Sequence, residues 1–68
     1  MNNFEHYDLM FRSFPDCLTV KELQVMLQIK RTKAYELLKE KVIPSKKIGK
    51  DYKIAKIHVI KFLMEVSS

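Results

Sequence analysis

Glycine, proline and cysteine are scarce in this sequence, which has one Gly, two Pro and one Cys among its 68 residues. Because few residues interrupt regular structure, we expect most of the chain to form helices and strands. The single glycine also excludes a glycine-rich loop of the kind that cradles nucleotide phosphates. The lone thiol, Cys17, cannot form an intramolecular disulfide, which favours a reducing compartment.

Long apolar runs are missing as well, since no stretch approaches the roughly 20 residues that span a bilayer. The N-terminus has early acidic residues and no basic segment followed by an apolar run, so it lacks the pattern of a secretory signal. We therefore expect a cytoplasmic protein with no membrane partner.

Motifs for catalysis and metal binding are lacking too. His6 and His58 lie in different predicted segments without acidic partners at ligand spacing, and no serine lies in a nucleophile motif. A chain of this length buries only roughly 60% of the surface of its unfolded state, which leaves little room for a shaped pocket. We expect no metal, no cofactor, no small-molecule substrate and no enzymatic activity.

Basic residues, by contrast, are abundant and unevenly distributed. The formal net charge is +5, with −2 on residues 1–18 and +6 on residues 30–53, where nine bases meet three acids. A positive field this concentrated attracts polyanions such as nucleic acid. Lysine also keeps small proteins soluble, so charge alone leaves both interpretations open.

Residues 3–14 have the apolar spacing of a short amphipathic helix, which Pro15 ends. Four aromatic side chains at spacings of three and four form one stripe on it: Phe4, Tyr7, Phe11 and Phe14. The stripe either packs onto the core or forms a surface for a second copy or another partner, because four rings are a large apolar load for one helix. We assign residues 1–17 to this helix and a linker, and residues 18–68 to the domain that follows.

Two helices joined by a very short break are predicted next. Thr19 and Glu22 have the spacing of a capping box, in which each side chain bonds to the amide of the other residue, at the start of a helix over 20–27. A second helix over 31–41 follows the break. The residues expected to face inward are Val20, Leu23, Met26, Leu27, Ala34, Leu37 and Leu38.

Residues 46–48 and 52–54 predict two short strands around Gly49, whose backbone freedom suits a tight turn. The alternation of side chains predicts a core-facing set and a solvent-facing set. We expect Ile48, Tyr52 and Ile54 to face the core, and Lys47 and Lys53 to face solvent.

The C-terminal residues 57–66 predict a last helix, with a stripe made of Ile57, Ile60, Leu63 and Met64. The order of helix, break, basic helix and basic hairpin is that of a winged helix-turn-helix. The predicted fold class is therefore mainly α, a winged helix-turn-helix with a short two-stranded antiparallel β hairpin and an extra N-terminal helix.

The ordered motifs between residue 18 and about residue 64 resemble the excisionase-type helix-turn-helix family, a compact relative of the MerR-like winged helices. Each motif is weak alone, but the ordered set at these spacings is fairly specific for the fold. The matching positions are Leu18-Thr19-Val20-Lys21-Glu22, Ile29, Ala34-Tyr35, Ile43-Pro44, Lys47-Ile48-Gly49 and Tyr52-Lys53-Ile54.

The sequence departs from the family pattern at four points. Gln28 stands where the family has a turn glycine, and Lys41 or Val42 where it has a glycine after the second helix. Lys30 replaces the usual small capping residue, so Thr32 is a candidate cap in its place. After Gly49 the family commonly has two basic residues, whereas here Lys50 is followed by Asp51, which would repel phosphate.

The resemblance implies that the second helix enters the major groove of double-stranded DNA, while the wing contacts the backbone or the minor groove. Thr32, Lys33 and Glu36 are then placed for base edges: a thymine methyl, a guanine acceptor and a cytosine amino group. Glu36 could equally pair with a base on its own helix, such as Lys39 or one near Arg31. The positions implied for phosphate contact are Arg31, Tyr35 and Lys39 on the helix and Lys46, Lys47, Lys50 and Lys53 on the wing.

The family also implies a biological role. Proteins of this kind resemble recombination directionality factors, which bind short repeated sites, bend the duplex and assist an integrase. The implied partners are DNA, an integrase and neighbouring copies of the chain on DNA. One alternative is a small transcriptional regulator of a phage, plasmid or transposon. A second is a winged-helix module that binds protein, which the acidic Glu36 and Asp51 leave open.

Overall fold

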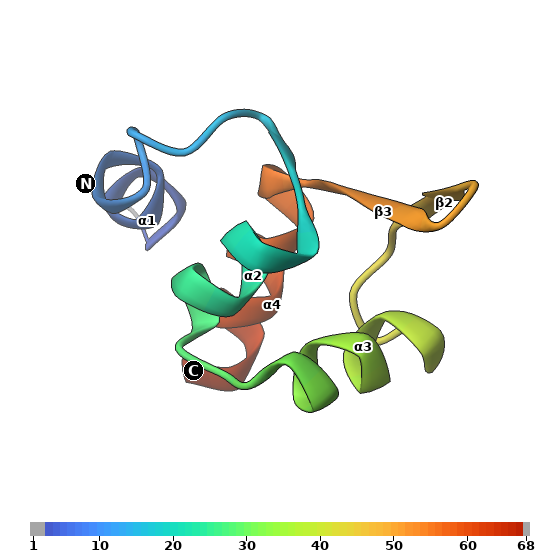
Figure 1. Cartoon of the computed structure of the whole chain (residues 1–68). Coiled ribbons are helices and arrows are strands. Elements are labelled where there is room, and N and C mark those ends of the chain that lie inside the picture. Colours follow the sequence, from blue (N-terminus) through green and yellow to red (C-terminus); the bar gives the residue numbers. More distant parts are fainter. Residues whose placement is uncertain (1–2, 68) are drawn as a thin grey trace.

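Helices surround a small sheet from which a hairpin projects (Figure 1). The computed structural model describes residues 3–67. Along this range the elements are α1 (Asn3–Met10), β1 (Cys17–Leu18), α2 (Val20–Leu27), α3 (Arg31–Lys39), β2 (Lys46–Ile48), β3 (Asp51–Ala55) and α4 (Lys56–Ser67). The predicted fold class, a mainly α winged helix-turn-helix, is confirmed. None of the helices within these residues is both long and apolar enough to cross a membrane.

The sheet has one strand more than predicted. Its order is β1-β3-β2, and both pairings are antiparallel. Leu18 lies opposite Ile54 and Cys17 opposite Ala55, so the end of the predicted linker is a strand. A strand of two residues is too short to show alternation, and this explains why the sequence did not reveal it.

Helix α2 has the predicted bounds, and its capping box is present. The Thr19 hydroxyl oxygen accepts from the Glu22 amide at 3.2 Å, and Glu22 Oε1 accepts from the Thr19 amide at 2.9 Å. The helix ends at Gln28, which takes the left-handed conformation with φ 55° and ψ 47°. The amides of Gln28 and Ile29 then donate to the carbonyls of Val25 and Gln24, which closes the turn as a Schellman motif.

Helix α3 begins at Arg31 after an extended Lys30 that provides no side-chain cap, so the prediction of Thr32 as the cap is wrong. It ends at Lys39 rather than at residue 41, because Lys41 turns left-handed with φ 58°. The amides of Lys41 and Val42 donate back to the carbonyls of Leu38 and Leu37, a second Schellman motif. Lys41 thus occupies the position where the family has glycine.

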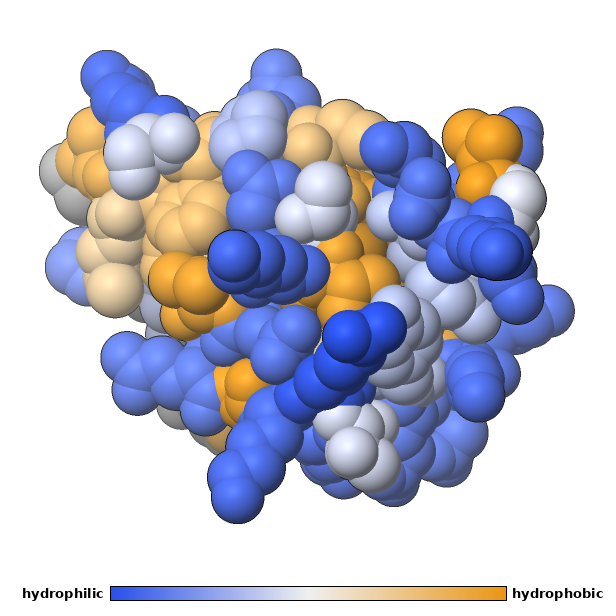
Figure 2. All heavy atoms as spheres, viewed as in Figure 1, coloured by the Kyte–Doolittle hydropathy of each residue, from blue (hydrophilic) through white to orange (hydrophobic). Residues whose placement is uncertain are grey.

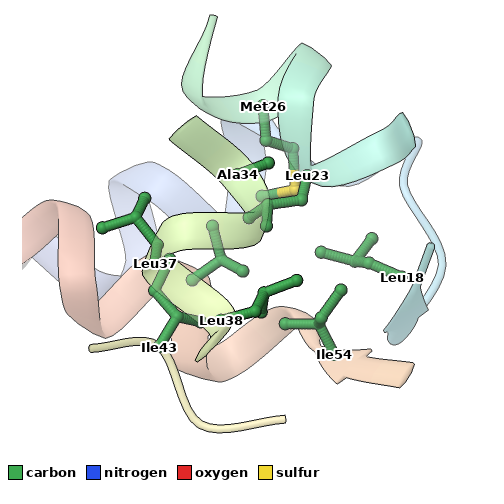
Figure 3. Close-up of a cluster of buried hydrophobic side chains, with 9 residues drawn as sticks. Leu18, Leu23, Met26, Ala34, Leu37, Leu38, Ile43 and Ile54 are labelled. Atoms are coloured by element: carbon green, nitrogen blue, oxygen red, sulfur yellow. The ribbon is translucent and has the colours of Figure 1, made fainter. Parts of the chain in front are cut away.

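The core lies where α2, α3, α4 and the base of the sheet meet. Figure 3 shows side chains of α2 and α3 pointing toward Leu18 of β1 and Ile54 of β3. The predicted inward positions of α3, Ala34, Leu37 and Leu38, are all buried. The full cluster is Leu18, Leu23, Met26, Ala34, Leu37, Leu38, Ile43, Ile54 and Val59.

Two predicted core residues lie at the surface instead. Ile48 is 58% exposed because it lies opposite Asp51 in the register, and therefore on the face of the hairpin away from Tyr52 and Ile54. Ile57 is 43% exposed, and α4 buries Val59 and Ile60 in its place. Lys47, predicted to share the face of Lys53, lies opposite Tyr52 in the register and therefore on the face of Tyr52.

Helix α1 ends at Met10, four residues before the predicted end, and residues 11–14 form hydrogen-bonded turns. The aromatic stripe continues across these turns. The Tyr7 and Phe11 rings stack at 6.4 Å, and the Phe11 and Phe14 rings meet edge to face at 5.9 Å. Phe11 and Phe14 pack against the core cluster, and α1 lies against α4.

A buried lysine closes the contact between the N-terminal segment and α4. Lys56 is 9% exposed, and its Nζ donates to the carbonyl oxygens of Phe14 at 3.0 Å and Phe11 at 3.5 Å. The Asp16 carboxylate lies 3.8 Å from this ammonium, and the Lys56 amide donates to the Asp16 carbonyl at 2.8 Å. We call Lys56 and these three partners the N-terminal seam.

Candidate nucleic-acid interface

The outer face of α3 carries most of the predicted helix contacts. Arg31, Thr32, Lys33, Glu36 and Lys39 are exposed, whereas Tyr35 is half-buried toward the hairpin. The turn at Gln28 connects α2 to α3. It orients α3 so that its exposed face points away from the core. The face is therefore free to enter a groove wide enough for a helix, which in B-DNA is the major groove.

Lys33 and Glu36 pair with each other on this face. Lys33 Nζ lies 3.5 Å from Glu36 Oε1, and the two side chains remain 55% and 50% exposed. Of the two roles left open for Glu36, the structure shows the intrahelical ion pair. Its partner is Lys33 rather than Lys39, although both lysines lie three residues from Glu36 and so are its neighbours on the helix surface.

Four side chains form a row between α3 and the hairpin, which we call the junction: Arg31, Tyr35, Tyr52 and Lys47. The Arg31 guanidinium lies 5.4 Å from the centre of the Tyr35 ring. That ring meets the Tyr52 ring edge to face at 5.8 Å, and Lys47 Nζ lies 5.6 Å from the Tyr52 ring. Both ends of the row are cations over aromatic faces, a favourable arrangement that leaves their charge exposed. The junction fixes the hairpin beside α3.

A groove of about 600 Å³ opens on one side of the junction. Its walls come from the start of α2, from α3 and from the hairpin. Arg31, Lys50 and Lys53 bring predicted phosphate contacts together there, and Asp51 lies among them. The lining residues are Thr19, Val20, Lys21, Gln24, Arg31, Tyr35, Lys50, Asp51, Tyr52 and Lys53. A basic groove of this shape suits a phosphate backbone passing between helix and wing.

Lys21 and Gln24 were missed by the sequence prediction. They lie on the first helix of the pair, and in helix-turn-helix proteins this helix crosses the DNA backbone. That geometry, applied to the polar positions of α2, was the signal that would have identified them, since Lys21 is exposed and Gln24 is half-buried. Both are polar and able to donate hydrogen bonds to phosphate oxygens.

A second hollow of about 490 Å³ lies between the end of α3 and the hairpin. Three of its lining residues are lysines, and of these Lys41 was not predicted as a contact. Lys46 lies opposite Lys53 in the sheet and lines neither hollow. The residues around the second hollow are Leu38, Lys39, Lys41, Pro44, Ser45, Lys47 and Tyr52.

The N-terminal aromatic side chains take no part in this surface. Figure 1 places α1 and the hairpin at opposite ends of a molecule whose longest dimension is 38 Å. Figure 2 shows mostly hydrophilic side chains around α3 and the hairpin, with an apolar cluster at the end of the hairpin, and further apolar side chains toward α1 and in the centre of this face. Phe4, Tyr7, Phe11 and Phe14 are all half-buried. Their role as a partner surface stays a prediction.

No group of three His, Cys, Asp or Glu side chains that could hold a metal ion occurs in the part of the chain that the structure describes. The polar chemistry of the candidate site is instead that of lysine and arginine ammonium and guanidinium groups, two tyrosines and two carboxylates. Such a set binds phosphate and base edges through hydrogen bonds and charge.

Comparison with known families agrees with this geometry. Residues 17–67 match the model of a helix-turn-helix domain family, which covers most of the chain. The chain belongs to this family and is a DNA-binding helix-turn-helix protein. The match begins at β1, so α1 and the turns after it precede the family's region. No curated protein and no solved structure matches the chain.

Proposed function

We propose that the protein is an excisionase-like recombination directionality factor that binds short repeated DNA sites and assists an integrase. The observation that carries the proposal is the basic groove shared by α2, α3 and the hairpin. With α3 in the major groove of the DNA, the phosphate backbone would pass through the basic groove of the protein. The hairpin would then reach the adjacent minor groove of the DNA. The protein would act through binding alone, without catalysis.

Repeated sites follow from the size of the reading surface. One recognition helix of nine residues contacts only a few base pairs, so a single site gives little discrimination within a genome. Several sites side by side, or a protein partner on the same DNA, supply the missing specificity. Bending would follow if helix and wing hold two successive grooves of a deformable duplex.

Salt dependence tests the groove-and-wing mode of binding. If about six phosphates are neutralised, the logarithm of the binding constant should fall against the logarithm of salt concentration with a slope near −5. A band-shift titration on a duplex selected from a random library measures it. Lys50→Gln should make the slope less steep by about one unit, whereas Lys61→Gln, on the exposed side of α4, should not. A slope near zero would exclude the mode.

The recombination role needs its own measurement. On this proposal, we expect an integrase gene beside the gene of this protein. Purified protein added to that integrase, with a plasmid carrying the element's attachment sites, should increase excision and reduce integration. Binding to these sites with no effect on either reaction, together with repression of a nearby promoter, would identify a transcriptional regulator instead.

A further inference from the structure

We infer that Lys33 and Glu36 read one base pair as a unit, with a preference for G·C in the orientation that puts guanine beside Lys33. The inference rests on the proposed placement of α3 in the major groove. It goes further because it names the base pair, its orientation and the ion pair that reads it. Three observations carry it: the separation of the two charges, their exposure and their position on α3.

The separation of the charged atoms matches one base pair. Lys33 Nζ and Glu36 Oε1 are 3.5 Å apart, a donor beside an acceptor. In the major groove a G·C pair presents guanine O6, an acceptor, beside the cytosine amino group, a donor. These two atoms are joined by a Watson–Crick hydrogen bond and so lie about 2.9 Å apart. Both contacts can therefore form while the ion pair stays intact.

The exposure of the pair leaves it able to make these contacts. More than half of the Lys33 side chain and half of the Glu36 side chain are accessible. By contrast, the Arg31 guanidinium on the same helix already contacts the Tyr35 ring, and Arg31 lines the basic groove of the protein. Lys33 and Glu36 lie one turn apart on the exposed face, close to where a groove floor would be.

The pairing also explains how a carboxylate is tolerated on a surface that meets DNA. An isolated Glu36 would be repelled by nearby phosphates, but Lys33 neutralises it at short range. The two side chains then contribute no net charge and act through hydrogen bonds. A neutral pair adds little to non-specific affinity, which depends on net phosphate neutralisation, so its contribution is to sequence preference.

The order of donors and acceptors decides the orientation. With guanine beside Lys33, the ammonium reaches both N7 and O6, and Glu36 accepts from the cytosine amino group. In the reversed pair, C·G, the ammonium faces the amino donor and the carboxylate faces guanine O6, so both contacts are repulsive. A T·A pair keeps the order of O4 and N6, but it sets the thymine methyl against Lys33 and adenine N7 beside Glu36. We therefore expect G·C first, T·A second, and the two reversed pairs last.

A charge swap tests the inference on the intact chain. The variant Lys33→Glu/Glu36→Lys keeps the net charge of +5 and the spacing of the pair, but reverses donor and acceptor. Duplexes are selected from a randomised library with wild type and variant in parallel, and preferences are checked by competition band shifts. One position should change from G·C to C·G, with about a tenfold preference in each direction.

A matched swap on another helix controls for general effects. Lys61→Glu/Glu65→Lys, on exposed positions of α4, should select the same sequence as wild type. Replacing guanine by inosine at the assigned position should leave wild-type binding unchanged, since inosine alters only the minor-groove edge, while 7-deazaguanine, which lacks N7, should weaken it. If wild type selects a sequence and the Lys33/Glu36 swap selects the same one, the inference is overturned and DNA binding stands. If wild type enriches no duplex at all, both the inference and the proposed function fail.

Discussion

The N-terminal seam and the junction are both built around cations, but they use the charge in opposite ways. In the seam, Lys56 is buried and donates to main-chain carbonyls, so its charge holds two segments together. In the junction, Arg31 and Lys47 lie over tyrosine rings and remain exposed. A buried cation in this fold stabilises the structure, whereas an exposed cation on a ring is positioned and still available to phosphate.

The regions around α3 and around the N-terminal seam also differ in how much unfavourable backbone conformation they contain. The left-handed residues other than glycine, within residues 3–67, are Gln28 and Lys41, and they flank α3 on both sides. Lys30, at the start of α3, lacks a side-chain cap. Proteins commonly accept such local costs near a binding surface and offset them elsewhere. The capping box of α2 and the seam provide well-satisfied contacts away from the outer face of α3.

Breaking the seam should have the largest effect on stability. Lys56→Met should lower the free energy of unfolding by about 2 kcal/mol, because it removes charged hydrogen bonds to two carbonyls that are partly buried. Urea unfolding measures the change from the midpoint. Lys61→Met, on the exposed side of the same helix, is the control and should change the stability by less than about 0.5 kcal/mol. Equal effects of the two variants would show that the seam does not stabilise the fold.

Breaking the junction should cost less. Tyr35→Ala and Tyr52→Ala should show a coupling energy of about 1 kcal/mol in a double-mutant cycle, because their rings contact edge to face. Tyr52→Phe keeps the ring and should retain most of this coupling. DNA affinity should fall more for Tyr52→Ala than for Tyr52→Phe, since the hairpin loses its position. Additive single variants would mean that the rings do not interact.

Removing the backbone strain at the turn before α3 should stabilise the protein, whereas the same substitution inside a helix should not. Gln28→Gly should raise the free energy of unfolding by about 0.5–1 kcal/mol, because glycine adopts the left-handed conformation without strain. The same substitution in the middle of α2, Gln24→Gly, should lower it by about 1 kcal/mol. Opposite signs are expected in parallel thermal melts, and two losses would contradict the assigned strain at Gln28.

The smallest effect is expected at the end of the hairpin. Ile48 is 58% exposed, so Ile48→Thr should change the unfolding free energy by less than about 0.5 kcal/mol. Ile54→Thr, at the base of the same hairpin, replaces a fully buried apolar side chain by a smaller one with a hydroxyl group and should lower the unfolding free energy by more than about 1 kcal/mol. A similar loss in both variants would show that Ile48 packs on the body in solution.

The fold was predictable wherever several local signals agree. For α2, the capping box, the apolar stripe and the short break all indicate the same bounds, and the structure has them. Alternation in the hairpin marked Ile48 and Ile54 alike, because alternation within each strand does not fix the register between the two strands, and this register places Ile48 on the other face. Nothing local distinguishes Lys56 from a surface lysine, since its partners are carbonyls of residues more than 40 positions away.

The candidate site also contains residues that the sequence predicted and residues that it did not. The cations of α3 and the hairpin follow from the order of elements, and the structure brings several of them to one groove. The partner of Glu36 could not be assigned from sequence, because Lys33 and Lys39 lie three residues away on either side of it and both spacings allow contact on a helix. Lys21 was missed because α2 was interpreted only through its capping box and its inward face.

The acceptors of Lys56 have a consequence for how the sequence can vary. Two of its three side-chain partners are main-chain oxygens, which every amino acid supplies. The seam therefore constrains the path of the chain at residues 11–14 but not the chemistry of the side chains there. The exposed positions of α1, such as Leu9 and Met10, can change in a relative without loosening the attachment of the helix. A single lysine thus lets this end of the molecule diverge while its place in the fold is kept.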